Sequence, residues 1–207
     1  MIKKIIIIIC MFFLVGCTTN NINKMSLTEI INTSIKEKSE LYNINGKGYK
    51  YYLPTEFTLY REDDYVQELL SHSTNYYLNI DIVSYYYKSK MTTDHDFDDY
   101  EYFTFENGDK NGYLRITKKD DYFFVELCYN YAIIEVEVKE SELRYAISRS
   151  IAILKSIKYN DLVIEKYISE NDLDSSETVY KIPEPKNKDE SKNILEYIEE
   201  YEYKDEE

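Results

Sequence analysis

The sequence predicts an α+β fold in which two helices cover one face of an antiparallel β-sheet. Apolar and polar residues alternate with a period of two between residues 48 and 139, which is the spacing of half-buried strands. A capping box before this region and an apolar stripe after it predict one helix on each side. The short turns between successive strands favour an antiparallel meander with one solvated face.

The first helix is predicted to begin at a capping box. Ser26 and Glu29 stand three residues apart, so each side chain can accept a hydrogen bond from the backbone N–H of the other. We expect this helix to end near Ser39. Its apolar residues fall on one face at helical spacing: Leu27, Ile30, Ile31 and Ile35.

Eight strands are expected in the central region, separated by residues that favour tight turns. These turn residues are Asn107-Gly108, Asn111-Gly112, Asp120-Asp121 and Asn130. The longest expected strand is 76–87, in which Leu78, Ile80 and Ile82 share one face. The expected strands are 49–53, 57–61, 66–71, 76–87, 100–105, 113–118, 122–128 and 132–138.

The second helix is predicted over 141–156, directly after the last strand. Its apolar residues recur at helical spacing, so one side of this helix is suited to packing. We expect this helix to cover the buried face of the sheet. The stripe comprises Leu143, Ala146, Ile147, Ser150, Ile151 and Leu154.

The N-terminus carries the pattern of an exported protein. Lys3 and Lys4 precede an uncharged apolar run of 11 residues, 5–15, which is too short to span a bilayer because a spanning helix needs about 20 residues. The run ends in Leu14-Val15-Gly16-Cys17, which resembles the lipobox of bacterial lipoproteins. The resemblance implies diacylglyceryl transfer to the Cys17 sulfur and cleavage after Gly16. It also implies a membrane-anchored protein on the extracytoplasmic side of the cell membrane.

These patterns divide the chain into four parts. They are a signal peptide (1–16), a polar lipidated tether (17–25), a globular α+β domain (26–160) and an acidic tail (161–207). The tail has 6 Lys against 16 Asp and Glu, a net charge of −10, and low apolar content, so we expect it to be largely disordered. Within it, 191–203 could form a short helix against a partner.

The order of elements over roughly 45–160 resembles the PsbP-like fold. The resemblance lies in Tyr-Tyr-Leu-Pro-Thr-Glu-Phe (51–57), in the long expected strand 76–87 and in the helix that closes the domain. Members of this family mostly act as binding or assembly accessories. The resemblance therefore implies a non-enzymatic role, and it assigns no functional residue.

The net charge and the number of cysteines limit the kinds of partner that this chain could bind. Without the signal peptide the chain has 23 Lys and Arg against 39 Asp and Glu, a net charge of −16. Binding of nucleic acid is not expected, because phosphate contacts need clustered Lys and Arg. Anionic lipids would repel this charge, so the lipid on Cys17 must make the membrane attachment. Cys10 leaves with the signal peptide, and Cys128 remains as a single thiol that we expect to be buried and inert.

One acidic segment suggests a weak metal site. Asp94, Asp96 and Asp98 alternate along the chain, which places hard oxygen ligands as in a calcium loop. Asp99 stands where the EF-hand pattern requires glycine, so that pattern fails. The alternatives are an irregular Ca²⁺ site and a solvated acidic loop. No other cofactor is expected.

Catalytic motifs are missing from the sequence. His72 and His95 are the two histidines, no G-x-S-x-G motif or glycine-rich phosphate loop occurs, and no zinc-ligand spacing is recognisable. We therefore predict a non-catalytic binding or accessory protein. A cell-envelope hydrolase and a calcium-responsive module based on 94–99 are the alternatives.

The 24 tyrosines suggest a binding surface. Codon bias and the strand propensity of tyrosine explain much of this number. In the expected strand 76–87, alternation places Tyr86 inward and Tyr85 and Tyr87 outward. We expect Tyr85 and Tyr87 to contact an extracytoplasmic protein or glycan, because tyrosine is enriched at interfaces.

Overall fold

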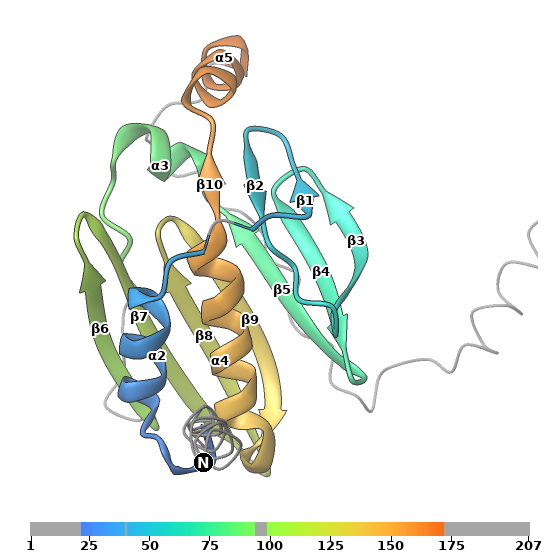
Figure 1. The fold of residues 1–207 in the computed structure, drawn as a ribbon, viewed down its shortest axis with the longest axis vertical. Coiled ribbons are helices and arrows are strands. Elements are labelled where there is room, and N and C mark those ends of the chain that lie inside the picture. The colour runs from blue at the N-terminus through green and yellow to red at the C-terminus, as the bar shows by residue number, and fades with distance from the viewer. Residues whose placement is uncertain (1–21, 40, 94–98, 172–207) are drawn as a thin grey trace, which may run out of the picture.

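The computed structural model describes residues 22–39, 41–93 and 99–171, and its α+β architecture confirms the predicted class (Figure 1). A seven-stranded antiparallel sheet has the order β3-β4-β5-β9-β8-β7-β6, and a three-stranded sheet has the order β1-β2-β10. The elements are η1 (Ile22–Lys24), α2 (Leu27–Lys36), β1 (Ile44–Asn45), β2 (Tyr49–Tyr51), β3 (Thr58–Asp63), β4 (Val66–Ser71), β5 (Thr74–Ile80), α3 (Ile82–Tyr87), β6 (Glu101–Asn107), β7 (Lys110–Lys119), β8 (Tyr122–Tyr129), β9 (Ala132–Lys139), α4 (Glu140–Ser156), β10 (Lys158–Tyr159) and α5 (Asp161–Asn171).

Helix α2 begins at the predicted capping box. The backbone N–H of Glu29 donates to the Ser26 hydroxyl, and the backbone N–H of Ser26 donates to the Glu29 carboxylate at 2.8 Å. The helix ends at Lys36, three residues before the predicted end at Ser39, because Glu37 already has extended backbone angles (φ −72°, ψ 129°).

The central strands form the predicted meander. Strands β6 to β9 pair with their neighbours in sequence, and β9 then pairs with β5. Left-handed residues make the turns at Gly108, Asp120 and Asn130, as those residues predict. The dipeptide Asn111-Gly112 was also expected to be a turn, but it lies inside β7.

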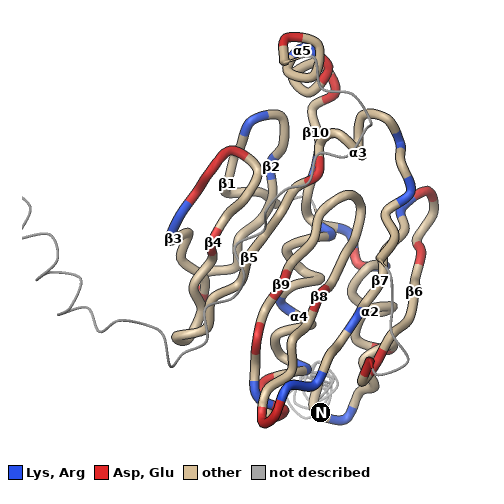
Figure 2. Tube along the Cα trace, turned by 180° about the vertical axis from the view of Figure 1, so that it is seen from behind, with Lys and Arg blue, Asp and Glu red and all other residues tan. Residues whose placement is uncertain are grey.

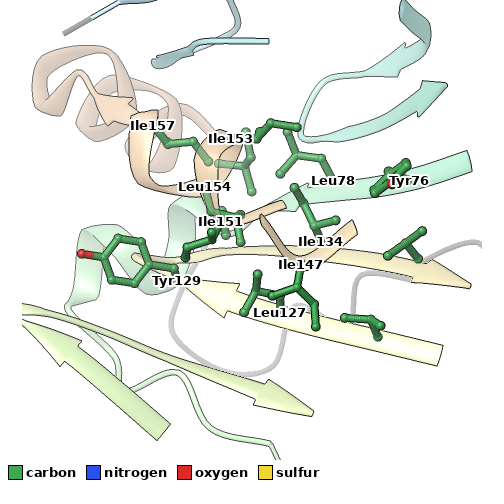
Figure 3. Close-up of a cluster of buried hydrophobic side chains, with 14 of the residues drawn as sticks. Tyr76, Leu78, Leu127, Tyr129, Ile134, Ile147, Ile151, Ile153, Leu154 and Ile157 are labelled. Carbon is green, nitrogen blue, oxygen red and sulfur yellow. The ribbon is translucent and has the colours of Figure 1, made fainter. Parts of the chain in front are cut away.

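The core lies between α4 and the middle of the large sheet (Figure 3). Ile147, Ile151 and Leu154 on α4 are fully buried, and Figure 3 shows Ile147 beside Leu127 of β8 and Ile134 of β9. Each large aliphatic side chain buried in this way stabilises the fold by about 1.5–3 kcal/mol. The helix predicted over 141–156 is therefore confirmed, both in its bounds and in the face that it buries.

A buried polar network holds the small sheet over one end of the large sheet. The Tyr51 hydroxyl donates to Oε1 of Gln67 at 2.5 Å, and Nε2 of Gln67 donates to the Tyr49 hydroxyl at 2.9 Å. The same Nε2 donates to Glu62 at 2.8 Å. Gln67 is fully buried, so these bonds satisfy an amide that would be costly to leave unpaired. In Figure 1 the small sheet lies on the same face of the large sheet as α2 and α4.

The strand expected over 76–87 is shorter than the sequence pattern suggests, and that prediction is wrong for its second half. Strand β5 ends at Ile80, and helix α3 begins after Asp81. The Asp81 carboxylate accepts a hydrogen bond from the backbone N–H of Ser84 at 2.8 Å. This N-cap satisfies a free N–H group of the first turn, which favours helix over a continued strand.

The folded domain extends beyond residue 160, where the sequence analysis placed the start of the tail. Helix α5 follows β10, and its Ile164 and Ile168 are buried against the rest of the domain. Gly48 has a φ of +86°, and a Cβ there would lie 2.8 Å from a side-chain carbon of Ile164. Glycine at this turn therefore lets α5 pack closely against the small sheet.

We predict that α5 contributes to the stability of the domain. Ile164→Ala should lower the free energy of unfolding by about 2–5 kcal/mol, as buried large-to-small changes do. Leu162 is 78% exposed on the same helix, so Leu162→Ala should change it by less than about 0.5 kcal/mol. Urea unfolding followed by circular dichroism measures both. Equal stability of the two variants would show that α5 is not part of the cooperative unit.

Candidate functional site

Helix α3 places the three consecutive tyrosines differently from the predicted strand. The Tyr85 ring stacks on Tyr159 with 3.9 Å between ring centroids, and its hydroxyl donates to the Asp161 carboxylate at 2.6 Å. Lys88 lies over the same ring at 3.6 Å. Burial and the bond to Asp161 raise the pKa of Tyr85 to about 12. The prediction that Tyr85 points outward is therefore wrong: Tyr85 joins α3 to β10 and α5.

The neighbours of Tyr85 are exposed. Tyr86 is 39% exposed, so the prediction that it faces the core is also wrong, while Tyr87 is 42% exposed, as expected. The reason is the period of 3.6 residues in α3, which replaces the strand alternation behind those predictions. Helix α5 contacts α3 and exposes Leu162 and Val163. We call Tyr86, Tyr87, Leu162 and Val163 the α3–α5 surface.

The second candidate region is the face of the large sheet opposite α2 and α4, which we call the open face (Figure 2). A row of polar residues crosses this face from strand to strand. Adjacent strands pair Tyr102 with Arg115, Arg115 with Glu126, Glu126 with Glu135 and Glu135 with Tyr77. Two carboxylates thus stand directly opposite each other on β8 and β9.

Arg115 is the cation of this row. Its Nε lies 3.1 Å from the Asp99 carboxylate, and a terminal nitrogen lies 3.9 Å from Glu126. The Tyr113 hydroxyl donates to Glu126 at 2.5 Å, and the Thr117 hydroxyl donates to Asp99 at 3.2 Å. The Asp99 side chain is 4% exposed, so Asp99, two positions before β6, is fixed against the open face by charged hydrogen bonds.

The carboxyl group of Glu135 has an unusual pKa. Burial, and then the charge of Glu126, raise its pKa to about 7. A carboxyl group whose pKa lies near neutral pH can exchange protons with a bound molecule. The sequence analysis did not single out this pair of carboxyl groups. The signal was present, because a hairpin that turns at Asn130 and Tyr131 must place residue 126 opposite residue 135.

The structure also contains a shallow hollow of about 670 Å³ where α4 begins. Arg144 on its wall donates to the backbone oxygen of Met25 at 3.1 Å and so holds the start of the described chain against α4. His72 does not line this hollow; its ring lies 3.1 Å from the Ser71 hydroxyl and packs edge-on against Tyr145. The lining residues are Asn23, Asp121, Lys139, Glu140, Ser141 and Arg144.

Cys128 lies on β8 and is fully buried, as predicted. Burial raises the pKa of its thiol, and the nearby carboxylates of Glu126 and Asp81 raise it further. A thiol whose pKa is raised forms little thiolate, and the thiolate is the nucleophile. Cys128 therefore acts as a small apolar residue of the sheet.

Several predicted site residues lie outside the described part of the chain: Cys17, Asp94, Asp96, Asp98 and His95. Within residues 22–39, 41–93 and 99–171, no group of three or more His, Cys, Asp or Glu side chains could hold a metal ion. The calcium hypothesis therefore stays a prediction.

Comparison of the chain with protein-family models, with curated proteins and with solved structures finds no match. Among the described helices, none is both long enough and apolar enough to cross a membrane.

The geometry of α3 predicts opposite effects for neighbouring tyrosines. Tyr85→Ala should lower the free energy of unfolding by about 1–3 kcal/mol, because it removes a stacked ring and a hydrogen bond to Asp161. Tyr86→Ala and Tyr87→Ala should each change it by less than about 0.5 kcal/mol. Thermal and urea denaturation check this. If Tyr86→Ala proved as destabilising as Tyr85→Ala, the assignment of these faces would be incorrect.

The raised pKa of Glu135 predicts a pH effect. In an unfolded chain its carboxyl group loses its proton near the ordinary value of 4.5, whereas in the folded protein it does so near 7. The stability that the protonated Glu135 contributes to the fold is thus fully present below pH 4.5 and is lost as pH rises through 7. After allowance for screening by solvent, the loss is about 1–2 kcal/mol.

Glu135→Gln tests this effect, because glutamine has the shape of the protonated acid. The variant should be more stable than the wild type at pH 8, and the difference should disappear at pH 4. Urea titrations at a series of pH values measure this. A constant difference across the whole range would mean that Glu135 does not titrate as described.

Proposed function

We propose that this protein is a lipid-anchored, non-catalytic binding or accessory protein on the extracytoplasmic side of a bacterial cell membrane. Its partner would be an extracytoplasmic protein or glycan. The observation that carries the proposal is that the two ends of the domain differ. In Figure 1 the described chain begins at one end of the domain, and α3 and α5 lie at the other. These two helices expose Tyr86, Tyr87, Leu162 and Val163.

The anchoring end is supported by sequence and by geometry. The resemblance of residues 14–17 to a lipobox implies a lipid on Cys17, and the described chain begins at Ile22, which packs partly against the core. Four residues lie between these positions, and the five Cα–Cα steps from Cys17 to Ile22 span at most about 18 Å when fully extended. Arg144 and the capping box fix the chain at the start of α2. A lipid on Cys17 would therefore keep this end of the domain close to the bilayer.

The binding end is supported by the composition of the α3–α5 surface. Two tyrosines and two aliphatic residues are exposed on two short helices that contact each other. Interfaces favour aromatic residues that offer apolar area together with a polar hydroxyl. Tyr85 stacks on β10 and bonds to α5, which holds the two helices together and gives this surface a defined shape.

The Glu126–Glu135 pair favours one alternative, a cell-envelope hydrolase that would use these carboxyl groups for acid–base chemistry. A pKa near 7 suits a general acid or base. In that case Glu135→Gln would abolish a hydrolytic activity of the wild type on envelope glycans or peptides while the fold remained intact. The proposed binding role predicts equal behaviour of the two proteins in such assays.

The first experiment concerns the anchor. Cys17→Ala should remove the acceptor sulfur, so cells fed radiolabelled palmitate should label the wild type and not the variant. The variant should also keep its signal peptide and migrate as the larger precursor. Cys128→Ala is the matched control, and it should label like the wild type because Cys128 is buried in the domain. Labelling of Cys17→Ala would exclude the lipoprotein assignment.

The second experiment concerns the α3–α5 surface. A photo-crosslinking amino acid at Tyr86 or Leu162 should capture a specific partner in intact cells. The same amino acid at Tyr60, which is 67% exposed on the edge strand β3, is the control and should not capture it. Loss of an interface hot spot costs about 2 kcal/mol or more, so Tyr86→Ala should weaken that partner's binding about thirtyfold. Capture by Tyr60 alone would place the binding surface elsewhere.

A further inference from the structure

The large sheet has two edges, and they are built differently. At one edge, the pairing of β3 with β4 is interrupted by a bulge between Leu59 and Arg61, and the strand continues in the charged residues Arg61, Glu62 and Asp63. A bulge and a run of charges are two features by which proteins prevent an edge strand from pairing with another chain.

The opposite edge, β6, has neither feature. All seven of its residues, Glu101–Asn107, pair with β7 in one unbroken register. Its sequence Glu-Tyr-Phe-Thr-Phe-Glu-Asn contains no proline, lysine or arginine. Among the described residues, β6 is the last strand in the order of the sheet, so its outer side presents a regular series of backbone N–H and C=O groups. Such an edge is suited to receive one more strand.

We propose that β6 pairs antiparallel with β6 of a second copy of this chain, so that the two large sheets form one continuous sheet. The sequence of the strand matches itself in this arrangement. When the two-fold axis passes through Thr104, all seven residues pair, and Glu101 lies opposite Asn107 while Tyr102 lies opposite Glu106. Phe103 lies opposite Phe105. No carboxylate meets another carboxylate, and the phenylalanines form cross-strand aromatic pairs, which stabilise sheets.

The side chains are placed correctly for such a pairing. Phe105 is buried, and Phe103 packs partly against the core on the same face of the strand. A second copy would extend this apolar layer across the joined edge. Thr104 is exposed on the open face. At the two-fold axis its side chain therefore lies opposite Thr104 of the second copy. A two-fold axis perpendicular to the sheet keeps α2 and α4 of both copies on the same side. Both N-terminal tethers would then emerge on that side.

Cysteine crosslinking tests the pairing, because the chain offers no competing thiol. The protein is expressed from Thr18 onward, which removes Cys10 and Cys17, and Cys128 is buried. Opposite residues on antiparallel strands have Cα atoms about 4.5–5.5 Å apart, which fits a disulfide. Thr104→Cys should therefore form a disulfide-linked dimer under mild oxidation. Because this protein lacks the lipidation site, the result does not depend on the proposed anchor.

Glu101→Cys is the matched control on the same strand. In the proposed register the two Glu101 positions lie six residues apart, about 20 Å, so this variant should not crosslink. Glu101→Cys combined with Asn107→Cys should crosslink again, because these positions lie opposite each other. Equal crosslinking of Thr104→Cys and Glu101→Cys would show random collision and would overturn the proposal.

Light scattering after size-exclusion chromatography gives an independent measure. The wild type should elute with the mass of a dimer, and Thr104→Lys should elute as a monomer, because it places two like charges opposite each other at the axis. Thr58→Lys, at an exposed position of the other edge strand, should remain a dimer. Circular dichroism should show both variants folded. A monomeric wild type, or a dimeric Thr104→Lys, would overturn the proposal.

Discussion

The packing of α4 against β8 and β9 is the interaction on which the rest of the structure depends. It buries the apolar stripe of the longest helix against the two central strands, and the other layers on that face contact α4 in turn. Helix α2 packs beside α4, and the backbone N–H of Tyr52 donates to the Ser156 hydroxyl at 2.9 Å, which joins the small sheet to the end of α4. Because all these elements share one face, the opposite face carries the polar row around Glu126.

Burial explains several of the tyrosines. Tyr49, Tyr51 and Tyr76 lie in the core with exposed fractions of 3% or less, and burial raises the pKa of each hydroxyl, so each stays neutral. The hydroxyl groups of Tyr49 and Tyr51 bond to Gln67. Tyrosine therefore serves here as a core residue whose polar end needs a partner. The tyrosine number alone was a poor guide to a binding surface.

The sequence predicted an element correctly where its pattern of apolar residues was compatible with only one type of secondary structure. The capping box at Ser26 and the stripe of α4 were predicted correctly because both are local signals that packing reinforces. The region after Ile80 failed because Asp81 ends a strand-like alternation and also caps a helix, and only the N-cap bond to Ser84 distinguishes the two. Helix α5 failed because its charges were averaged with those of the acidic residues that follow. Ile164 and Ile168, spaced four apart, were the available signal.

The placement of α5 also changes how the net charge should be interpreted. Residues 172–207 have 5 Lys against 13 Asp and Glu, a net charge of −8. The described residues, 22–39, 41–93 and 99–171, have 18 Lys and Arg against 22 Asp and Glu, a net charge of −4. Most of the acidity therefore lies outside the described domain. Repulsion by anionic lipids acts over about 10 Å, so it depends on the charges that lie close to the bilayer. The domain itself is close to neutral, and a short tether could hold it near a bilayer with little electrostatic cost.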